Sequence, residues 1–308
     1  MGFRSFIVGS VAATGLFSAL SASAGHLGDD WSRVTLADQK AWSTLPQASL
    51  DRLASPVRLE FPGWSASAVY LGKFQGSDLF GTASHVLNQS GACSKLIANF
   101  YALNTMTGAP VTFSCQAIVS VLPSVDFTLW IGKARDLDSG VAVDFLAKRH
   151  SLRPNTAASD FVAGMELLLA GFGSQGNPTQ VLTFDRSDDC RLISDSGKFR
   201  AILPPGTTQG QKVESMAIGC DASPGDSGAP VFDRNTGTWM GIIWAGKSAP
   251  DPKLADSVFL RSLVGAPSSL VWSDLNYAVP ATQIAAALRA NLFAVDPVHL
   301  ASVQDWLK

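Results

Sequence analysis

Residues 223–232 read Ser-Pro-Gly-Asp-Ser-Gly-Ala-Pro-Val-Phe. Glycine at positions 225 and 228 lets the backbone around Ser227 adopt positive φ and leaves room for a substrate carbonyl. A serine nucleophile also needs a nearby base and backbone N–H groups directed at the developing oxyanion. The N–H groups of Gly225 and Ser227 are the expected oxyanion donors.

The tripeptide Asp-Ser-Gly is not specific by itself, because it occurs at 138–140, 195–197 and 226–228. Only the third copy has a preceding glycine and a following apolar run, at 229–232, that is typical of a strand. The extended context therefore selects Ser227 as the candidate nucleophile.

The candidate base is one of the four histidines, which occupy positions 26, 85, 150 and 299. His85 ends the small-residue run Gly-Thr-Ala-Ser-His, directly after the strand-like Leu79-Phe80. Such a run allows a tight turn that leaves the imidazole at the end of a strand. None of the other three histidines has a comparable context.

Composition excludes several classes of protein. The chain has 308 residues, of which 46% are hydrophobic and 16% charged, so a disordered chain and a coiled coil are excluded. The formal net charge of −2 gives no reason to expect nucleic acid or an anionic membrane as a partner. The length suffices for one large domain or two halves.

Short runs rich in Val, Ile, Leu, Phe and Thr recur from Pro56 onward, separated by turn-forming residues. This texture predicts an all-β barrel or sandwich. The runs are VRLEF (57–61), SAVYLG (67–72), VTFSCQAIVSVL (111–122), DFTLWIG (126–132), ELLLAGFG (166–173), APVFD (229–233) and WMGIIWAG (239–246).

Helical signals are few. Ile284, Leu288 and Leu292 recur at i, i+4 and i+8, which predicts a helix near the C-terminal end. A short helix is also expected around residues 36–42, and a seam near 139–160 is expected to join two β halves.

The first 24 residues are typical of an export signal. Arg4 provides a positive start, residues 6–20 are apolar or small, and Ala22-Ser23-Ala24 is a small-x-small cleavage site. An uncleaved anchor is the alternative, but the apolar run is short of the ~20 residues that span a bilayer. We expect a secreted protein, extracellular or periplasmic, with no membrane association after signal removal.

The four cysteines form an even set in an oxidising compartment, which predicts two disulfides. Three pairings are possible. We favour Cys93 with Cys115 and Cys190 with Cys220, because each pair then falls within one half of the chain. A zinc site is disfavoured because the chain has no CxxC or HxxxH spacing. We expect no metal and no cofactor.

The runs TASHV (82–86) and PGDSGAPVF (224–232) resemble the histidine and serine motifs of the chymotrypsin/trypsin-like serine peptidases, in their bacterial secreted form. Asp126, in Val-Asp-Phe-Thr-Leu-Trp, is similar to the family's Asp-Ile-Ala-Leu strand with the triad carboxylate. Further similarities lie at Gly164, 170–173, 241–246 and 277–280. The order His, Asp, Ser is also that of the family.

The resemblance covers about residues 56–293, after an N-terminal extension at 25–55. It implies two packed antiparallel β-barrels of six strands each, at about 56–145 and 160–280, with the site in the cleft between them. A C-terminal helix at 281–293 and a tail at 294–308 would follow.

The family's mechanism carries over to matching positions. Ser227 would attack the scissile carbonyl, His85 would take and return the proton, and Asp126 would hold the imidazole in its productive tautomer. The resemblance thus implies a serine endopeptidase that acts on protein or peptide substrates. A monomer is expected.

Three departures from the family pattern concern residues near the site. Val86 follows the histidine, where many animal members have cysteine. No activation sequence lies upstream, so Asp226 is expected to accept backbone hydrogen bonds or to find a cation other than a new N-terminal ammonium. We therefore expect activity without propeptide cleavage. Trp244 occupies the place of a serine that often supports the triad aspartate, which indicates either a one-residue shift in alignment or different surroundings for Asp126.

Substrate preference depends on Asp221, which lies six residues before Ser227, where trypsin-type enzymes place the pocket carboxylate. A buried unpaired carboxylate is costly, so Lys or Arg of a substrate would be its natural partner. However, Cys220 precedes Asp221, whereas the family's pocket cysteine usually follows it, so the loop could instead leave Asp221 at the surface. Small or apolar residues are then the alternative preference. Gly246 would keep the pocket mouth open.

Two other functions are alternatives to a serine endopeptidase. A catalytically silent relative could act as a protein-binding module on the same scaffold, and the complete triad favours the enzyme over it. An esterase on the α/β-hydrolase fold is excluded, because Gly-x-Ser-x-Gly is absent around Ser227 and that fold has the order Ser, Asp, His.

Overall fold

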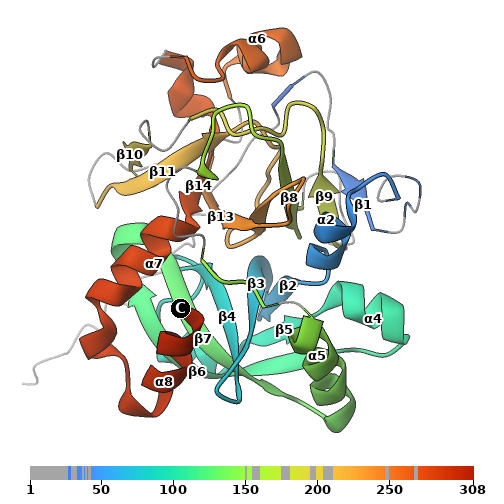
Figure 1. Ribbon diagram of the computed structural model, residues 1–308, viewed down its shortest axis with the longest axis vertical. Helices are drawn as coiled ribbons and strands as arrows, with labels where there is room; N and C mark the ends of the chain where they lie inside the picture. Colours follow the sequence, from blue (N-terminus) through green and yellow to red (C-terminus); the bar gives the residue numbers. More distant parts are fainter. Residues whose placement is uncertain are drawn as a thin grey trace, which may run out of the picture.

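The computed structural model describes residues 27–28, 33–36, 38, 40, 43–149, 151–154, 160–174, 181–194, 199–203, 211–246, 250–266 and 270–308. The expected export signal at 1–24 lies outside the described residues, as does most of the expected helix at 36–42. Figure 1 shows two β-rich halves, one above the other, with helices on their outer surfaces.

The first half is a closed antiparallel barrel of six strands, in the order β2-β3-β4-β7-β6-β5. Closure removes the exposed strand edges that an open sheet would present. Aromatic side chains fill the interior, where Phe80 stacks on Trp130 with ring centroids 4.2 Å apart. The strands are β2 (Pro56–Phe61), β3 (Trp64–Phe74), β4 (Ser77–Ala83), β5 (Ile97–Asn99), β6 (Thr112–Leu122) and β7 (Phe127–Ala134).

The second half is an eight-stranded antiparallel sheet, in the order β1-β9-β8-β12-β13-β14-β11-β10. Its two-residue strand β1 comes from the N-terminal extension. The strands are β1 (Val34–Thr35), β8 (Leu167–Gly171), β9 (Thr183–Asp185), β10 (Arg200–Ile202), β11 (Val213–Ile218), β12 (Pro230–Asp233), β13 (Trp239–Ala245) and β14 (Asn276–Pro280).

The expected closed antiparallel barrel is confirmed for the first half, and the described strands of the second half form an antiparallel sheet. The gap between β8 and β11 is crossed by single-residue bridges, from Glu166 to Arg191 and from Leu192 to Ile218. Residues 191 and 192 thus lie between the two ends of the part of the sheet that runs β8-β12-β13-β14-β11.

The two disulfides have the favoured pairing. Cys93 is bonded to Cys115 within the first half, and Cys190 is bonded to Cys220 within the second. The second bond ties the bridging segment at 190–192 to the chain that leads into the Ser227 loop.

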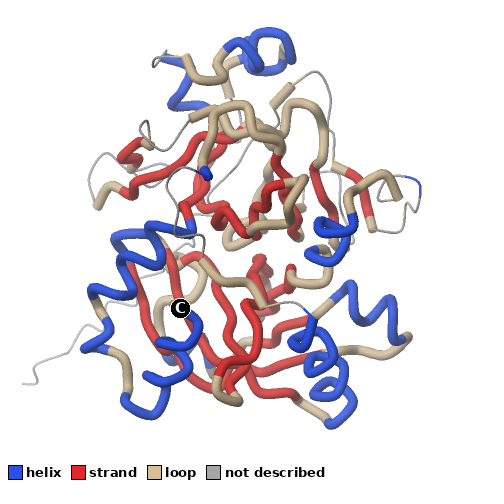
Figure 2. Tube along the Cα trace, viewed as in Figure 1, coloured by secondary structure: helices blue, strands red, loops and turns tan. Residues whose placement is uncertain are grey.

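Helices cover the outside of both halves (Figure 2). The expected C-terminal helix is present as α7, which ends at Ala290 and is followed by a 3₁₀ turn, Leu292–Ala294. Helix α5 occupies much of the expected seam at 139–160. The helices are α2 (Gln47–Arg52), α3 (Ser90–Cys93), α4 (Tyr101–Thr107), α5 (Leu137–Arg149), α6 (Ser257–Ser262), α7 (Ala281–Ala290) and α8 (Pro297–Trp306).

Residues 294–308, expected to be a tail, instead contain helix α8. Asp296 caps this helix by accepting from Val298 N, and Pro297 occupies its first turn. Val303 and Trp306 are buried, so the helix is held by packing that local periodicity did not reveal. Among the described residues, no helix combines the length and apolar character needed to cross a bilayer.

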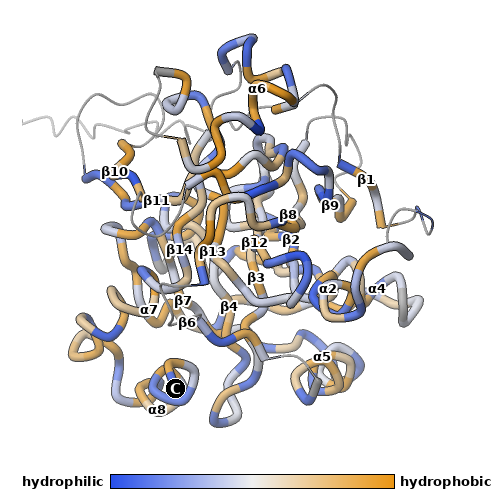
Figure 3. Tube along the Cα trace, turned by 45° about the horizontal axis from the view of Figure 1, so that its top comes forward, coloured by the Kyte–Doolittle hydropathy of each residue, from blue (hydrophilic) through white to orange (hydrophobic). Residues whose placement is uncertain are grey.

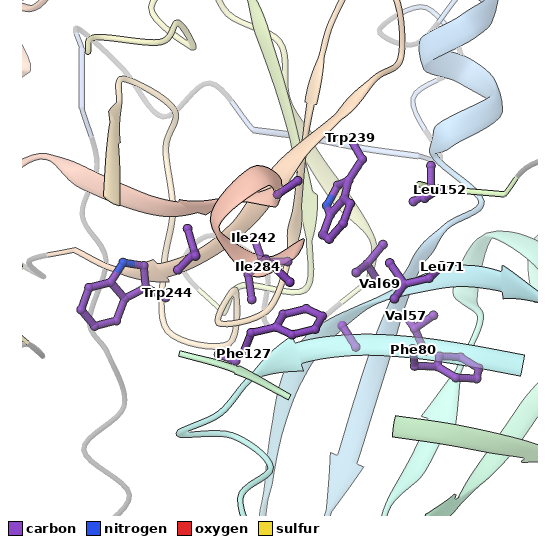
Figure 4. Packing of buried hydrophobic residues seen from close by; sticks show 14 of the residues in the cluster. Val57, Val69, Leu71, Phe80, Phe127, Leu152, Trp239, Ile242, Trp244 and Ile284 are labelled. Carbon is purple, nitrogen blue, oxygen red and sulfur yellow. The ribbon is translucent and has the colours of Figure 1, made fainter. Parts of the chain in front are cut away.

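One hydrophobic core joins the two halves. Val57, Val69 and Phe127 of the barrel lie in the same cluster as Trp239 and Ile242 of β13, as Figure 4 shows. Strand β13 is mostly hydrophobic where it crosses the centre of the molecule (Figure 3). The loops that carry the candidate site are therefore fixed by a shared core.

Candidate active site

Three chain segments meet where the two halves face each other. His85 follows β4, Asp126 precedes β7, and Ser227 lies in the loop before β12. Strands β4 and β7 are paired, with Ala83 opposite Phe127, so His85 and Asp126 lie beside each other. Ser227 comes from the second half.

The three predicted side chains form a hydrogen-bonded chain. His85 Nδ1 lies 2.7 Å from Asp126 Oδ2, and His85 Nε2 lies 2.9 Å from Ser227 Oγ. With the proton on Nδ1, the ring donates to the carboxylate and Nε2 can accept the serine proton. A hydroxyl, an imidazole and a carboxylate are thus within contact distance, which is the arrangement that nucleophilic catalysis requires.

Asp126 is buried and has two further donors. Its Oδ1 accepts from Ser84 Oγ at 2.6 Å and from His85 N at 3.0 Å. Ser84 was not among the site residues expected from the sequence, although its place directly before the candidate base was a usable signal.

Trp244 does not contact the carboxylate of Asp126. Its indole N–H donates instead to Ser215 Oγ at 2.9 Å. The hydroxyl that donates to Asp126 belongs to Ser84.

The pKa of His85 is raised above its ordinary value of 6.5. Burial of the ring lowers the pKa, but the negative charge of Asp126 and its hydrogen bond to the ring outweigh that effect. His85 therefore retains a proton to higher pH than an isolated histidine.

The loop with Ser227 has glycines where side chains do not fit. Gly225 has φ of 100° and Gly228 has φ of 87°. A Cβ on Gly228 would lie 2.3 Å from Ser67 O, so no larger residue fits there. The loop carries both expected oxyanion donors, Gly225 N and Ser227 N.

Strand β3 of the first half holds this loop. Ser67 N donates to Ser227 O at 3.1 Å, and Ser67 Oγ donates to Gly225 O at 2.8 Å. Ser67 was not found from the sequence, because nothing near it in the chain points to a site. Its contacts hold the Ser227 loop of the second half against the first half, which carries His85.

Asp226, adjacent to Ser227, is buried and has both of the expected kinds of partner. Its carboxylate accepts from Gly173 N at 2.9 Å and from Ser223 N at 2.8 Å. It also forms an ion pair with Arg33, whose side chain is fully buried.

Asp221 lies in the interior rather than at the surface. Its Oδ1 accepts from Leu27 N at 2.8 Å, and its own N donates to Asp185 Oδ2 at 2.7 Å. Gly246 directly follows β13 and is buried. The structure does not bring Asp221 or Gly246 into the hydrogen-bonded group around Ser227.

Among the described residues, one group of potential metal ligands comes together, consisting of Asp185, Cys190 and Cys220. Both sulfurs are committed to the disulfide, so they are not thiolate ligands.

Comparisons with known proteins give similarity at the level of structure. No family model and no curated protein sequence matches the chain. A serine-to-alanine mutant of Rv3671c from M. tuberculosis H37Rv, in its inactive form, is 15% identical with a TM-score of 0.50, covering 82% of this chain and 92% of that one. The scabies mite inactivated protease paralogue S-I1 is 13% identical with a TM-score of 0.49, covering 79% of this chain and 96% of that one.

Identities this low show the fold alone. The match to Rv3671c agrees with the closed antiparallel barrel, the second antiparallel sheet and the C-terminal helices. The chain therefore has the chymotrypsin-like fold of the trypsin-like serine proteases.

Proposed function

We propose that this protein is a secreted serine endopeptidase that hydrolyses peptide bonds through an acyl-enzyme. The observation that supports the proposal most directly is the continuous hydrogen-bonded chain from Asp126 through His85 to Ser227. A nucleophile and its base within hydrogen-bond reach, with a third group orienting the base, is the arrangement that acyl transfer needs.

In the first half-reaction, Ser227 Oγ attacks the scissile carbonyl carbon while its proton passes to His85 Nε2. The carbonyl oxygen becomes an oxyanion, which Gly225 N and Ser227 N would stabilise. The C–N bond then breaks, and His85 returns the proton to the leaving amine. Asp126 stabilises the imidazolium without taking its proton.

In the second half-reaction, water attacks the ester formed with Ser227. His85 Nε2 takes a proton from that water and returns it to Ser227 Oγ when the ester bond breaks. The enzyme is restored and the carboxylic acid product leaves. No metal or cofactor enters these steps.

The substrate side-chain preference is the less constrained part of the proposal. The position of Asp221, six residues before Ser227, supports cleavage after Lys or Arg. Its contact with Leu27 N argues for small or apolar residues instead, because a basic side chain would have to share a buried carboxylate that already accepts a backbone hydrogen bond. Cleavage sites on a peptide library distinguish the two.

Export to an extracellular or periplasmic compartment is supported by the two disulfides, which persist where the environment is oxidising.

A fluorophosphonate probe tests the proposal, because it reacts only with an activated serine. We expect the wild-type protein to be labelled at Ser227 and to cleave peptides, and we expect Ser227→Ala to do neither while keeping its fold. Ser94→Ala is the matched control, since the Ser94 hydroxyl is exposed and donates to Gly91 O. A folded wild-type protein with neither labelling nor cleavage would instead be a silent relative with a binding role.

A further inference from the structure

The loop that carries Ser227 is held by the N-terminal segment, defined here as the described residues 27–28 and 33–36. Arg33 donates from Nη1 to Asp226, the residue directly before the nucleophile, and from Nη2 to Thr183 O at 3.0 Å. Val34 and Thr35 pair with β9, so the backbone next to Arg33 is anchored in the second sheet. The backbone from which the Arg33 side chain reaches the Ser227 loop is therefore held in place by β9.

The same segment makes a second contact with the loop. Leu27 N donates to Asp221 Oδ1 at 2.8 Å, and Gly28 N donates to Leu254 O at 2.8 Å. Asp221 lies six residues before Ser227 and Asp226 lies directly before it, and both are buried. Two carboxylates of one loop are thus engaged by one short segment from outside the main β-strands.

Charge balance makes the Arg33 contact the more important of the two. Asp226 is 1% exposed, and the N–H groups of Gly173 and Ser223 provide dipoles but no positive charge. Among the described residues, Arg33 is the cation that forms an ion pair with Asp226. Removing one partner of a buried pair leaves an uncompensated charge, which is strongly unfavourable.

The position of Asp226 determines which backbone groups would shift if its carboxylate lost the ion pair. Asp226 lies between Gly225 and Ser227, whose N–H groups are the expected oxyanion donors. A carboxylate without its cation would have to turn toward water, and the peptide groups on either side would turn with it.

We propose that the N-terminal segment is a built-in activation segment, in which Arg33 is the positioning residue that keeps Gly225 N and Ser227 N in working geometry. The inference rests on the proposed peptidase function and extends it to a region outside the strands that carry the triad. It explains how the enzyme would be competent without chain cleavage, because the cation is a side chain present from synthesis.

The test replaces Arg33 by Ala and measures the rate of fluorophosphonate labelling and the values of kcat and KM. Loss of one oxyanion donor lowers kcat by about 100-fold or more, and we expect Arg33→Ala to lose at least that much. Millimolar guanidinium or methylguanidinium should restore part of the activity by occupying the vacated site, and Arg33→Lys should retain more activity than Arg33→Ala.

The matched control is Arg52→Ala. Arg52 also belongs to the N-terminal extension and donates to a backbone carbonyl of the second half, Gly237 O, at 2.9 Å. This contact does not involve Asp226. We expect it to keep wild-type kcat and KM and to show no response to guanidinium.

A structural readout separates this inference from the proposed function. Hydrogen exchange over residues 220–228 should become faster in Arg33→Ala than in the wild type, whether or not the wild type hydrolyses peptides. An inert wild-type protein with this change in exchange would overturn the peptidase proposal alone. An active wild type, with Arg33→Ala equally active and equally protected, would overturn the inference alone.

Failure to fold would not leave the question open. In Arg33→Met/Asp226→Asn both charges are removed, so no buried ion lacks a partner and we expect a folded protein with reduced kcat. Full activity in this double variant would show that the pair does not position the oxyanion donors. Arg33→Ala could also lose activity in proportion to its loss of global stability, with no rescue by guanidinium. That result would show that Arg33 has a purely structural role.

Discussion

Asp126 adopts a backbone conformation that few residues other than glycine tolerate. Its φ of 40° and ψ of 46° lie in the left-handed region, where aspartate and asparagine are the more acceptable of the larger residues. Two backbone hydrogen bonds fix it, from Asp126 N to Pro123 O at 3.2 Å and from Ser84 N to Asp126 O at 3.0 Å. Strain of this kind is retained where a side chain must point in one direction, here toward His85.

Ser84 should matter for turnover through its hydrogen bond to Asp126. Removal of a hydrogen bond to a charged group costs about 1.5 kcal/mol or more, so Ser84→Ala should lower kcat/KM roughly 10-fold. Steady-state kinetics measure the effect, with Ser94→Ala as the control at an exposed serine. Equal kcat/KM for the wild type and Ser84→Ala would mean that His85 N alone orients the carboxylate.

The pH dependence of kcat/KM should follow the protonation of His85. Because Asp126 raises the pKa of His85 above 6.5, the ring stays protonated, and unable to accept the serine proton, up to a higher pH. Activity should therefore rise with pH, with a midpoint above 6.5. In Asp126→Asn the charge that raises the pKa is gone, so the midpoint should move to lower pH while the plateau falls. A wild-type midpoint below 6.5 would contradict this account.

At the scale of single elements, α8 shows how a C-terminal helix can belong to the core. Trp306 is fully buried, and its indole N–H donates to Leu152 O at 2.8 Å. Its ring centroid lies 6.2 Å from that of Trp239 in β13. The helix thus links the chain between the halves to the second sheet.

Trp306→Ala should lower the free energy of unfolding by about 3–5 kcal/mol, the usual cost of removing a large buried aromatic side chain. Urea unfolding measures the change. Val298→Ala on the same helix is the control, because Val298 is 79% exposed and its removal should change stability by less than about 0.5 kcal/mol. Equal midpoints for the two variants would mean that α8 is not part of the cooperative unit.

At the scale of the whole molecule, each terminal region packs against the half that is more distant from it in the sequence. Strand β1, from the N-terminal extension, pairs with β9 of the second sheet. Helices α7 and α8, which follow the second sheet, lie beside the first barrel (Figure 1). The hydrophobic cluster that includes Val57, Trp239 and Ile284 is continuous between the halves.

Because the halves share this core, the protein with its disulfides intact should unfold in one cooperative transition. Scanning calorimetry should give equal calorimetric and van't Hoff enthalpies. Two resolved transitions would show instead that the barrel and the second sheet are independent domains.

The sequence by itself selected the three side chains that the structure joins by hydrogen bonds, His85, Asp126 and Ser227. It also predicted the β-rich fold, the disulfide pairing and the helix that begins at Ala281. These features have local signals, because glycine placement, apolar periodicity and the residues flanking a motif all act over a few positions of the chain.

Tertiary structure alone decided which groups support that site. Arg33 and Asp226 are 193 residues apart, and no pattern near either one indicates the other. The bridging of the second sheet by residues 191 and 192 and the burial of α8 depend in the same way on how distant segments pack. A buried ion pair or a sheet closure is determined by which surfaces exclude water together, and that is a property of the folded chain rather than of any stretch of it.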